Sequence, residues 1–458
     1  MALSTDTAPV IVAPRLPARP AAPEDLAGRH WPVAVIGAGQ AGLSMSRCLQ
    51  RRGIDHVVLE RAEVAHSWKT YRWDTFCLVT PNWQCRLPDF PYGHGGHGGD
   101  DPHGFMVREQ IVDYLEAYRA FVDPPVVEGV EVTRLTRDER GTYHLSTSAG
   151  GLTADQVVVA TGGYHTPIAP PLSQPLPAEI TQVQSQDYKN AAQLPPGEVL
   201  VVGSGQSGAQ IAEDLHLEGR QVHLVVGDAP RVARFYRGRD VTDWLAEMGY
   251  YDMPVTEHPR REAVRAQANH YVTGRDGGRD IDLRAHARDG MRLYGLLTDH
   301  RDGVLHFDTD LARRLDHADE VSESIKDTID RYIAQEGIDA PVEQRYTPVW
   351  RPEREVTHLR LAATGITSVV WCIGFRHDFR WIDVPVFSGR GAPAHTRGVT
   401  SSPGLYFLGL PWLWTWGSGR FSGVGQDAEH LAERIGSRRG LTGTGPRGDV
   451  CNVLALGS

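Results

Sequence analysis

The sequence predicts an α/β protein made of two Rossmann-like dinucleotide-binding domains, the second inserted into the first. Two glycine-rich motifs lead to this prediction, GAGQAG at residues 37–42 and GSGQSG at residues 203–208. Each follows a short β-rich segment and precedes a helical pattern, which is the order of a dinucleotide-binding βαβ unit. In both copies a helix-ending glycine follows the last motif glycine by eleven residues, and the second strand ends after eighteen. One such motif is a weak signal, but two copies in register predict two nucleotide sites.

The order of segments predicts where the domains begin and end. After an antiparallel segment that ends at 155–163, Pro167, Pro170 and Pro171 mark a crossover into the second domain. Residues 404–409 are expected to return to the first domain as a strand, followed by a helix at 422–435. The expected ranges are a disordered tail at 1–30, the first domain at 31–165 and 370–437, the second at 166–369 with a possible substrate-capping segment at 236–310, and a flexible tail at 438–458.

Composition excludes several classes of function. The 458 residues carry 47 Lys and Arg against 57 Asp and Glu, a net charge of -10, so binding to a nucleic-acid backbone is not expected. No apolar run approaches the ~20 residues of a membrane-spanning helix. The first residues do not resemble a secretory signal, and the five cysteines contain no CxxC pair, so a reducing cytoplasm is expected. No metal site is expected either, because the histidines of 92–104 lie in a glycine-rich loop.

The first motif predicts a site for FAD. Gly37, Gly39 and Gly42 are expected to allow a tight turn, close approach to a pyrophosphate and packing of the helix on its strand. The N–H groups at the start of that helix, predicted from Leu43, would face the phosphates, and Gln40 of the motif is also expected to bind the cofactor. Glu60 ends the second strand, where a carboxylate accepts hydrogen bonds from both ribose hydroxyls and repels a 2′-phosphate. This favours the free ribose of FAD; the alternative is a surface glutamate at a strand end.

The second motif predicts a site for NADPH. Val226 occupies the position that Glu60 has in the first site, and Arg231 and Arg234 follow in a short loop. A neutral residue followed by cations is the arrangement expected around a 2′-phosphate. Asp228, between Val226 and the arginines, would instead favour NADH, and either arginine could be a solvated loop charge. The motif residues expected to bind this cofactor are Gly203, Gly205, Gln206, Ser207 and Gly208.

Two features near the ends of the first domain predict contacts with the flavin. A glycine-rich turn from Gly417, shortly after Gly409, precedes the last helix, whose N-terminal dipole would stabilise charge on the reduced flavin. The alternative is a simple tight turn. Aromatic residues gather at 68–83 and 412–416, and their usual role is core packing. Because these clusters flank the flavin domain, Trp68 is expected to help wall the flavin or the substrate pocket.

These motifs together resemble the class B flavin monooxygenases, which include flavin-containing, YUCCA-type and N-hydroxylating enzymes. The resemblance rests on GAGQAG with Glu60, ATGG at 160–163, GSGQSG, WCIGF at 371–375 and GLYFLG at 404–409. It covers residues 31–437, and the stretch from 67 to 91 is similar to the segment that lines the flavin in YUCCA-type members. The resemblance implies FAD, NADPH and dioxygen, with a flavin hydroperoxide that delivers one oxygen atom to a soft nucleophile or a carbonyl.

Other stretches resemble a narrower group, the FAD-dependent oxidoreductases encoded in bacterial nitrilase gene clusters tied to cyanide use. The stretches are SWKTYRWDTFCLVTPNWQC, GDDPHGFMVR, NHYVTGRDGGRDIDLR and LGLPWLWTWGSGRFSGV. This resemblance implies a small, nitrogen-containing substrate. It indicates no particular reaction.

One departure from the monooxygenase pattern keeps other functions open. In the fingerprint FxGxxxHxxxY, Ala178, Ile180 and Gln184 replace Phe, Gly and His, and only Tyr188 remains. The asparagine that some members place beside the hydroperoxide has no match in register, and Asn82 is the nearest candidate. The flavin itself would carry the chemistry. The alternatives are an NAD(P)H-dependent flavin dehydrogenase or reductase with another acceptor, and a non-enzymatic flavoprotein subunit or redox sensor.

Overall fold

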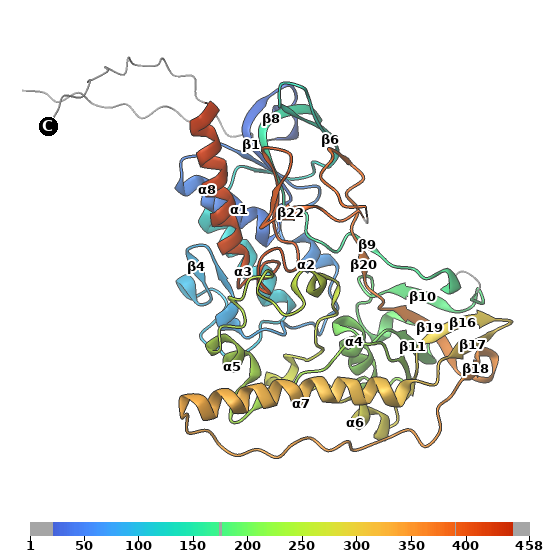
Figure 1. The fold of residues 1–458 in the computed structure, drawn as a ribbon. Helices are drawn as coiled ribbons and strands as arrows, with labels where there is room; N and C mark the ends of the chain where they lie inside the picture. Colours follow the sequence, from blue (N-terminus) through green and yellow to red (C-terminus); the bar gives the residue numbers. More distant parts are fainter. Residues whose placement is uncertain (1–21, 174–175, 390, 443–458) are drawn as a thin grey trace, which may run out of the picture.

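The computed structural model describes residues 22–173, 176–389 and 391–442, and its core consists of two sheets with parallel strands (Figure 1). The parallel strands of the first sheet have the order β5–β2–β1–β8–β24. Their bounds are β1 His30–Ile36, β2 Val57–Leu59, β5 Val126–Val127, β8 Gly150–Val159 and β24 Leu405–Phe407. The return strand expected at 404–409 is therefore confirmed, and it pairs with β8.

An antiparallel extension continues the first sheet beyond β8. β6 (Val132–Arg137) pairs with β7 (Tyr143–Thr147), and β7 pairs with the first half of β8. This confirms the antiparallel segment expected between the two motifs. The edges carry β21 (Ile382–Asp383), β22 (His395–Thr396) and β23 (Val399–Thr400), and β3 (Arg86–Leu87) and β4 (Phe90–Pro91) form a separate hairpin.

Helices cover the first sheet and bury its apolar side chains. α1 (Gln40–Arg51) packs beside α8 (Val424–Thr442), as Figure 1 shows, and α3 (Arg108–Val122) packs on α1. Leu43 of α1 and Leu431 of α8 are fully buried in one apolar core with Val35 of β1. The short helix α2 (His66–Thr70) contacts α3. α8 continues to Thr442, past residue 435 where the sequence had predicted its end, and no proline interrupts this stretch.

The second sheet is entirely parallel, in the order β10–β19–β11–β12–β15. Its strands are β10 Thr181–Gln184, β19 Ile366–Trp371, β11 Glu198–Val202, β12 Val222–Val225 and β15 Arg292–Tyr294. α4 (Gln206–Leu217) connects β11 to β12, so the second glycine motif lies at a strand–helix turn as predicted. β15 lies inside the segment 236–310, so part of that segment completes the sheet.

The remaining elements surround the second sheet and its link to the first. β16 (Leu297–Arg301), β17 (Val304–Phe307) and β18 (His358–Arg360) form an antiparallel sheet, and the long helix α7 (Leu311–Glu336) runs below α4 and α5 in Figure 1. β9 (Thr166–Pro167) and β20 (Phe375–Arg376) pair where the chain passes between the two large sheets. The other short elements are β13 Phe235–Tyr236, β14 Arg239–Asp240, α5 Val241–Glu247 and α6 Leu283–Arg288. None of the described helices is both long and apolar enough to cross a membrane.

Candidate cofactor and active site

Two glycines of the first motif are required by the protein itself. Gly37 has φ +102°, and a Cβ atom there would lie 2.7 Å from the carbonyl oxygen of Ala160. A Cβ atom on Gly42 would lie 1.8 Å from the carbonyl oxygen of Gly37. Any side chain at either position would therefore push the turn away from β8 or α1 away from the turn.

No contact within the protein requires a glycine at the middle position of the first motif. Gly39 has φ -74° and ψ -171°, a conformation open to any residue, and a Cβ atom there would meet nothing within 4 Å. Gly39 is also the N-cap of α1, and no side chain caps the free N–H groups there. An open glycine below uncapped N–H groups fits a phosphate that approaches the backbone from outside the protein.

Glu60 lies beside this turn, directly after β2. Its Oε2 accepts a hydrogen bond from the Ala38 N–H at 2.7 Å, and its Oε1 accepts one from the Ala62 N–H at 3.0 Å. Two backbone N–H groups thus orient the carboxylate, and each oxygen retains a lone pair for a further donor. The geometry fits the predicted recognition of two ribose hydroxyls.

The second motif repeats this geometry. Gly203 has φ +102°, and its Cβ atom would lie 2.6 Å from the carbonyl oxygen of Cys372. A Cβ atom on Gly208 would lie 1.8 Å from the carbonyl oxygen of Gly203. Gly205, with φ -66° and ψ -175°, is again open, caps α4 and has no side-chain capping bond. In both motifs the first and last glycines are required by packing. In both, the middle glycine is open and could face a ligand.

The two sites differ at the end of the second strand. Val226 is buried where the first site has Glu60, and Ser204 Oγ accepts a hydrogen bond from the Gly227 N–H at 2.9 Å. Gln206 Nε2 donates to the carbonyl oxygen of Val272 at 2.6 Å, and Ser207 is half-buried next to it. The loop after β12 is therefore attached to the glycine turn by a serine, and no carboxylate occupies the position of Glu60.

The two arginines predicted to bind a 2′-phosphate are buried, and each forms an ion pair. Arg231 Nε donates to Asp319 Oδ1 at 2.6 Å, and Arg234 Nε lies 3.3 Å from Asp240 Oδ2. Arg234 Nη1 also donates to the carbonyl oxygen of Val79 at 2.7 Å. Nη2 of Arg231 is buried without a hydrogen-bond partner among the described residues. Carboxylates inside the protein compensate both charges, and the role of these arginines in cofactor choice stays a prediction.

A charged pair that the sequence analysis did not identify lies at the same place. Arg314 of α7 donates from Nη1 to Asp228 Oδ1 at 2.5 Å and from Nε to Asp310 Oδ2 at 2.6 Å. The Arg314 side chain is buried, whereas that of Asp228 is 75% exposed. The carboxylate next to the second glycine turn is thus Asp228, held by a cation from a distant helix. Local sequence contains no signal for this contact.

Three further residues predicted to bind cofactor hold the last loop against the start of α1. Gln40 Nε2 donates to the carbonyl oxygen of Gly419 at 3.4 Å, and Trp68 Nε1 donates to Gln40 Oε1 at 3.4 Å. The Trp68 ring stacks on Phe421, with centroids 5.5 Å apart. Gly409 is also required by packing, because its Cβ atom would lie 2.7 Å from that of Ala41. The structure therefore brings these predicted residues together at the first motif.

Asn82 is buried and its amide holds a neighbouring loop. Oδ1 accepts from the Met106 N–H at 2.8 Å, and Nδ2 donates to the carbonyl oxygen of Asp101 at 3.0 Å. Tyr188, the remaining fingerprint residue, is also fully buried and donates to Asp214 Oδ2 at 2.7 Å. Both side chains have clear structural partners, and a catalytic role for Asn82 stays a prediction.

A short segment connects the two motifs. Asn269 Oδ1 accepts from Arg420 Nη2 at 2.9 Å in the loop before α8, and Val272 accepts from Gln206 at the second motif. His270 lies between these two contacts, and burial lowers its pKa to about 4. Its imidazole is therefore neutral, on a segment that bonds both the loop before α8 and the second motif. The residues around His270 have no recognisable spacing in the sequence, so the sequence does not predict this position.

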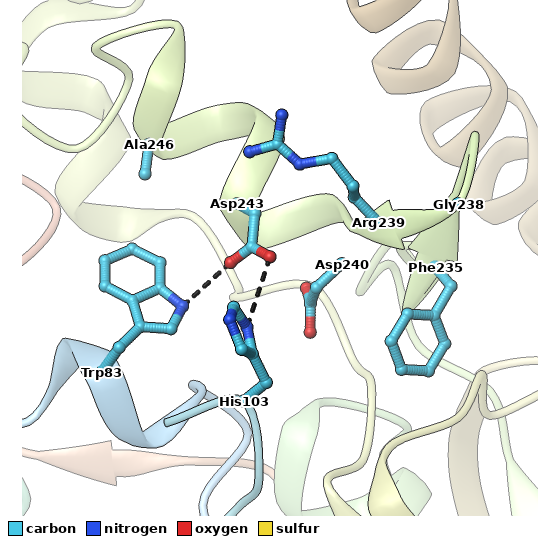
Figure 2. A pocket seen from close by; sticks show the side chains of 8 residues that line it. All are labelled: Trp83, His103, Phe235, Gly238, Arg239, Asp240, Asp243 and Ala246. Atoms are coloured by element: carbon cyan, nitrogen blue, oxygen red, sulfur yellow. Dashed lines mark hydrogen bonds and ion pairs between the residues drawn. The ribbon is translucent and has the colours of Figure 1, made fainter. Parts of the chain in front are cut away.

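A cavity of about 610 Å³ lies between the loop that contains Trp83 and His103 and the region from β13 to α5 (Figure 2). Asp243 is oriented by both loop residues: Trp83 Nε1 donates to Oδ1 at 2.8 Å, and His103 Nδ1 lies 3.5 Å from Oδ2. Asp240 also lines the cavity, next to Asp243 in Figure 2. The volume is in the range of small-molecule sites.

Neither metal nor thiol chemistry is indicated by the described residues. They contain no group of three His, Cys, Asp or Glu side chains placed to hold a metal ion. The rings of His94 and His97 lie against Phe90. The four described cysteines are buried and unpaired, and burial raises the pKa of the Cys48 thiol to about 12. The fifth, Cys451, lies outside the described residues.

The fold and the paired glycine turns define a two-domain, dinucleotide-binding oxidoreductase. The model of the pyridine nucleotide-disulphide oxidoreductase family matches residues 34–273, just over half of the chain. The chain is 31% identical over 406 residues to "Uncharacterized oxidoreductase CzcO-like" of Geobacillus kaustophilus (strain HTA426), covering 88% of this chain and 97% of that protein. The chain therefore belongs to the pyridine nucleotide-disulphide oxidoreductase family.

Monooxygenases are among its relatives and structural neighbours. Indole-3-pyruvate monooxygenase YUCCA6 of Arabidopsis thaliana is 31% identical over 207 residues, which cover 43% of this chain and 48% of that protein. A flavin-containing monooxygenase from Stenotrophomonas maltophilia has the same fold, with a TM-score of 0.60 at 18% identity over 90% of this chain and 99% of that one. These findings support the resemblance to class B flavin monooxygenases. None of these names concerns nitrilase gene clusters, so that narrower resemblance stays a hypothesis.

Proposed function

We propose that this protein is an FAD-dependent, NADPH-using monooxygenase that oxygenates a small substrate. The observation that carries the proposal is the pair of open middle glycines, Gly39 and Gly205, each below the uncapped N-terminus of a helix. Two such turns in one chain are suited to one bound dinucleotide each. An electron carrier and its reductant are the simplest pair of ligands for them.

The residues of this chain would bind and orient the cofactors. Glu60 suits the free ribose of FAD, while the second turn lacks a carboxylate at the matching position, which favours NADPH. Segment 269–272 would hold the two sites in register through Arg420 and Gln206. When bound, the cofactors supply the chemistry: hydride from NADPH reduces FAD, and dioxygen then gives one atom to the substrate and one to water.

The nature of the substrate and the location of the protein are further parts of the proposal. A nitrogen-containing substrate rests on the nitrilase-cluster resemblance alone. A cytoplasmic location rests on the cysteine pattern alone. The domain ranges predicted above, with FAD on the first domain and NADPH on the second, are part of the same proposal.

A second candidate is an NAD(P)H-dependent flavin dehydrogenase with another electron acceptor. It is favoured by the altered fingerprint, in which Ile180 is buried and Tyr188 bonds Asp214. A disulphide reductase is a weaker candidate, because the described cysteines are buried and unpaired. Incorporation of labelled dioxygen into a substrate would separate an oxygenase from both of these reductases.

The binding part of the proposal is tested by substitution of Glu60. Glu60→Gln keeps an acceptor for the Ala38 N–H but removes the charge, and Glu60→Arg removes both. We expect FAD content to fall in the first variant and to be lost in the second, with the exposed Glu139→Arg as the matched control. Equal FAD content in all three variants would refute the assignment of the first site.

A further inference from the structure

Two arginines lie at the mouth of the first dinucleotide site. The guanidinium carbon of Arg72, just after α2, is 4.9 Å from the ring centroid of Trp68, and that of Arg420 is 3.8 Å from the ring centroid of Trp416. Trp68 stacks on Phe421, the residue after Arg420, and bonds Gln40 at the start of α1. Arg72 therefore lies over one ring of the stacked pair, and Arg420 precedes the other ring in the chain.

Neither arginine has a carboxylate partner among the described residues. Arg72 Nη1 donates to the carbonyl oxygen of Tyr71 at 2.8 Å. Arg420 donates from Nη1 to the carbonyl oxygen of Trp416 and from Nη2 to Asn269 Oδ1 at 2.9 Å. By contrast, the buried Arg231 and Arg234 of the second site each have a carboxylate within ion-pair distance. The positive charges of Arg72 and Arg420 are uncompensated.

The pKa values of these two arginines are those of charges without a partner. It lowers the pKa of Arg72 and of Arg420, and the only titratable side chains that oppose it are tyrosines, Tyr164 for both. Arg231 is also buried, which lowers its pKa, yet the pKa is raised overall because Asp319 and other acidic groups around it together outweigh the burial. Both side chains are half-buried, and a partly desolvated cation without a counter-charge is costly, so an anionic ligand would stabilise the pair.

We propose that Arg72 and Arg420 form a subsite for an anionic oxygen group, a carboxylate of the substrate or a phosphate of a dinucleotide. Guanidinium groups bind both by paired, charge-assisted hydrogen bonds. A substrate carboxylate is the favoured source, because the N-terminus of α1 already faces the pyrophosphate position and Asn269 ties Arg420 to segment 250–270. That segment packs on the first domain, because Val255 and Val264 form one apolar cluster with Trp412. In this form the inference rests on the proposed function and adds the substrate class to it.

The test titrates the FAD-loaded protein with benzoate and follows the visible absorbance of the flavin and the tryptophan fluorescence. Benzamide, of the same shape but neutral, is the control ligand. The variants are Arg72→Gln and Arg420→Gln, with Arg420→Lys to keep a charge. Arg380→Gln is the control variant, because Arg380 is 90% exposed and pairs with Asp378. Thermal unfolding midpoints establish that each variant is folded.

We expect benzoate, but not benzamide, to perturb the wild-type and Arg380→Gln proteins, and its dissociation constant to rise at least tenfold in both Gln variants. The benzoate dissociation constant of Arg420→Lys should lie between those of the wild type and Arg420→Gln. If both Gln variants instead lose FAD, or raise the Michaelis constant for NADPH at least tenfold, the anion is a phosphate and the subsite is still supported. Unchanged FAD content, NADPH constant and benzoate response in both Gln variants would overturn the proposal.

Failure of the proposed function gives a different result. A protein that binds no FAD or does not oxidise NADPH contradicts the monooxygenase, but its anion subsite can still be examined. Trp68 and Trp416 contact the two arginines, so the fluorescence of the FAD-free protein should respond to benzoate or inorganic pyrophosphate. Loss of that response in the Gln variants would support the subsite, and no response in the wild type to either anion would contradict it.

Discussion

Substitution of the middle glycines by alanine should remove cofactor binding without unfolding the protein. At Gly39 and Gly205 the backbone conformation suits alanine, and the added methyl group meets no protein atom within 4 Å. Alanine is a poorer N-cap than glycine but reduces the entropy of the unfolded chain, so the free energy of unfolding should change by about 1 kcal/mol or less. In the complex, the same methyl group would occupy the space through which the phosphate approaches.

The expected loss of affinity follows from the hydrogen bonds that this approach makes possible. Displacing a phosphate from one charged hydrogen bond costs about 1.5–3 kcal/mol, which weakens binding roughly 10- to 150-fold. Dissociation constants for FAD in Gly39→Ala and for NADPH in Gly205→Ala would be measured together with thermal unfolding of the cofactor-free proteins. Gly389→Ala, also open but in an exposed loop, is the control.

Two results would refute this reasoning. The first is a Gly39→Ala protein that binds FAD as tightly as the wild type. The second is an unfolding midpoint as low as that of Gly42→Ala, in which the Cβ atom would lie 1.8 Å from the Gly37 carbonyl oxygen and must disrupt the turn. The first result would mean that no phosphate approaches Gly39, and the second would mean that the fold itself requires this glycine.

Two other predictions concern the coenzyme and acid stability. Asp228→Asn should lower the Michaelis constant for NADPH about three- to tenfold relative to that for NADH, because it removes a carboxylate beside the second glycine turn and releases Nη1 of Arg314, whose Nε stays paired with Asp310; an unchanged ratio in steady-state kinetics would contradict this. His395 accepts a hydrogen bond from the Gly398 N–H, and burial, with Arg265, lowers its pKa to about 4. Between pH 6.5 and 4 the unfolded chain binds a proton that the folded protein does not, so stability should fall by about 3 kcal/mol as the pH falls. Urea unfolding of His395→Asn should show a shallower loss over this range, and an identical pH profile would exclude the role of His395.

The sequence predicted those parts of the fold and the site that depend on neighbouring residues. The two strand–turn–helix units follow from local glycine spacing, and the structure confirms both turns and the position of Glu60. The ion pair of Arg231 was not predictable, because Asp319 lies on a helix about ninety residues later. Arg314 and Asn269 were missed for the same reason. Short-range motifs determine the backbone of the site, while its charge balance depends on contacts between distant segments.

The central claim, that the two sites deliver electrons from NADPH to dioxygen for oxygenation, is tested most directly by stopped-flow spectroscopy. The purified protein would be reduced with NADPH without oxygen, mixed with oxygenated buffer, and followed through the flavin absorbance. The account predicts full reduction by NADPH and then a long-lived species whose spectrum differs from both the reduced and the oxidised flavin. No reduction by NADPH, or direct return to oxidised flavin with release of peroxide both with and without candidate substrates, would contradict it.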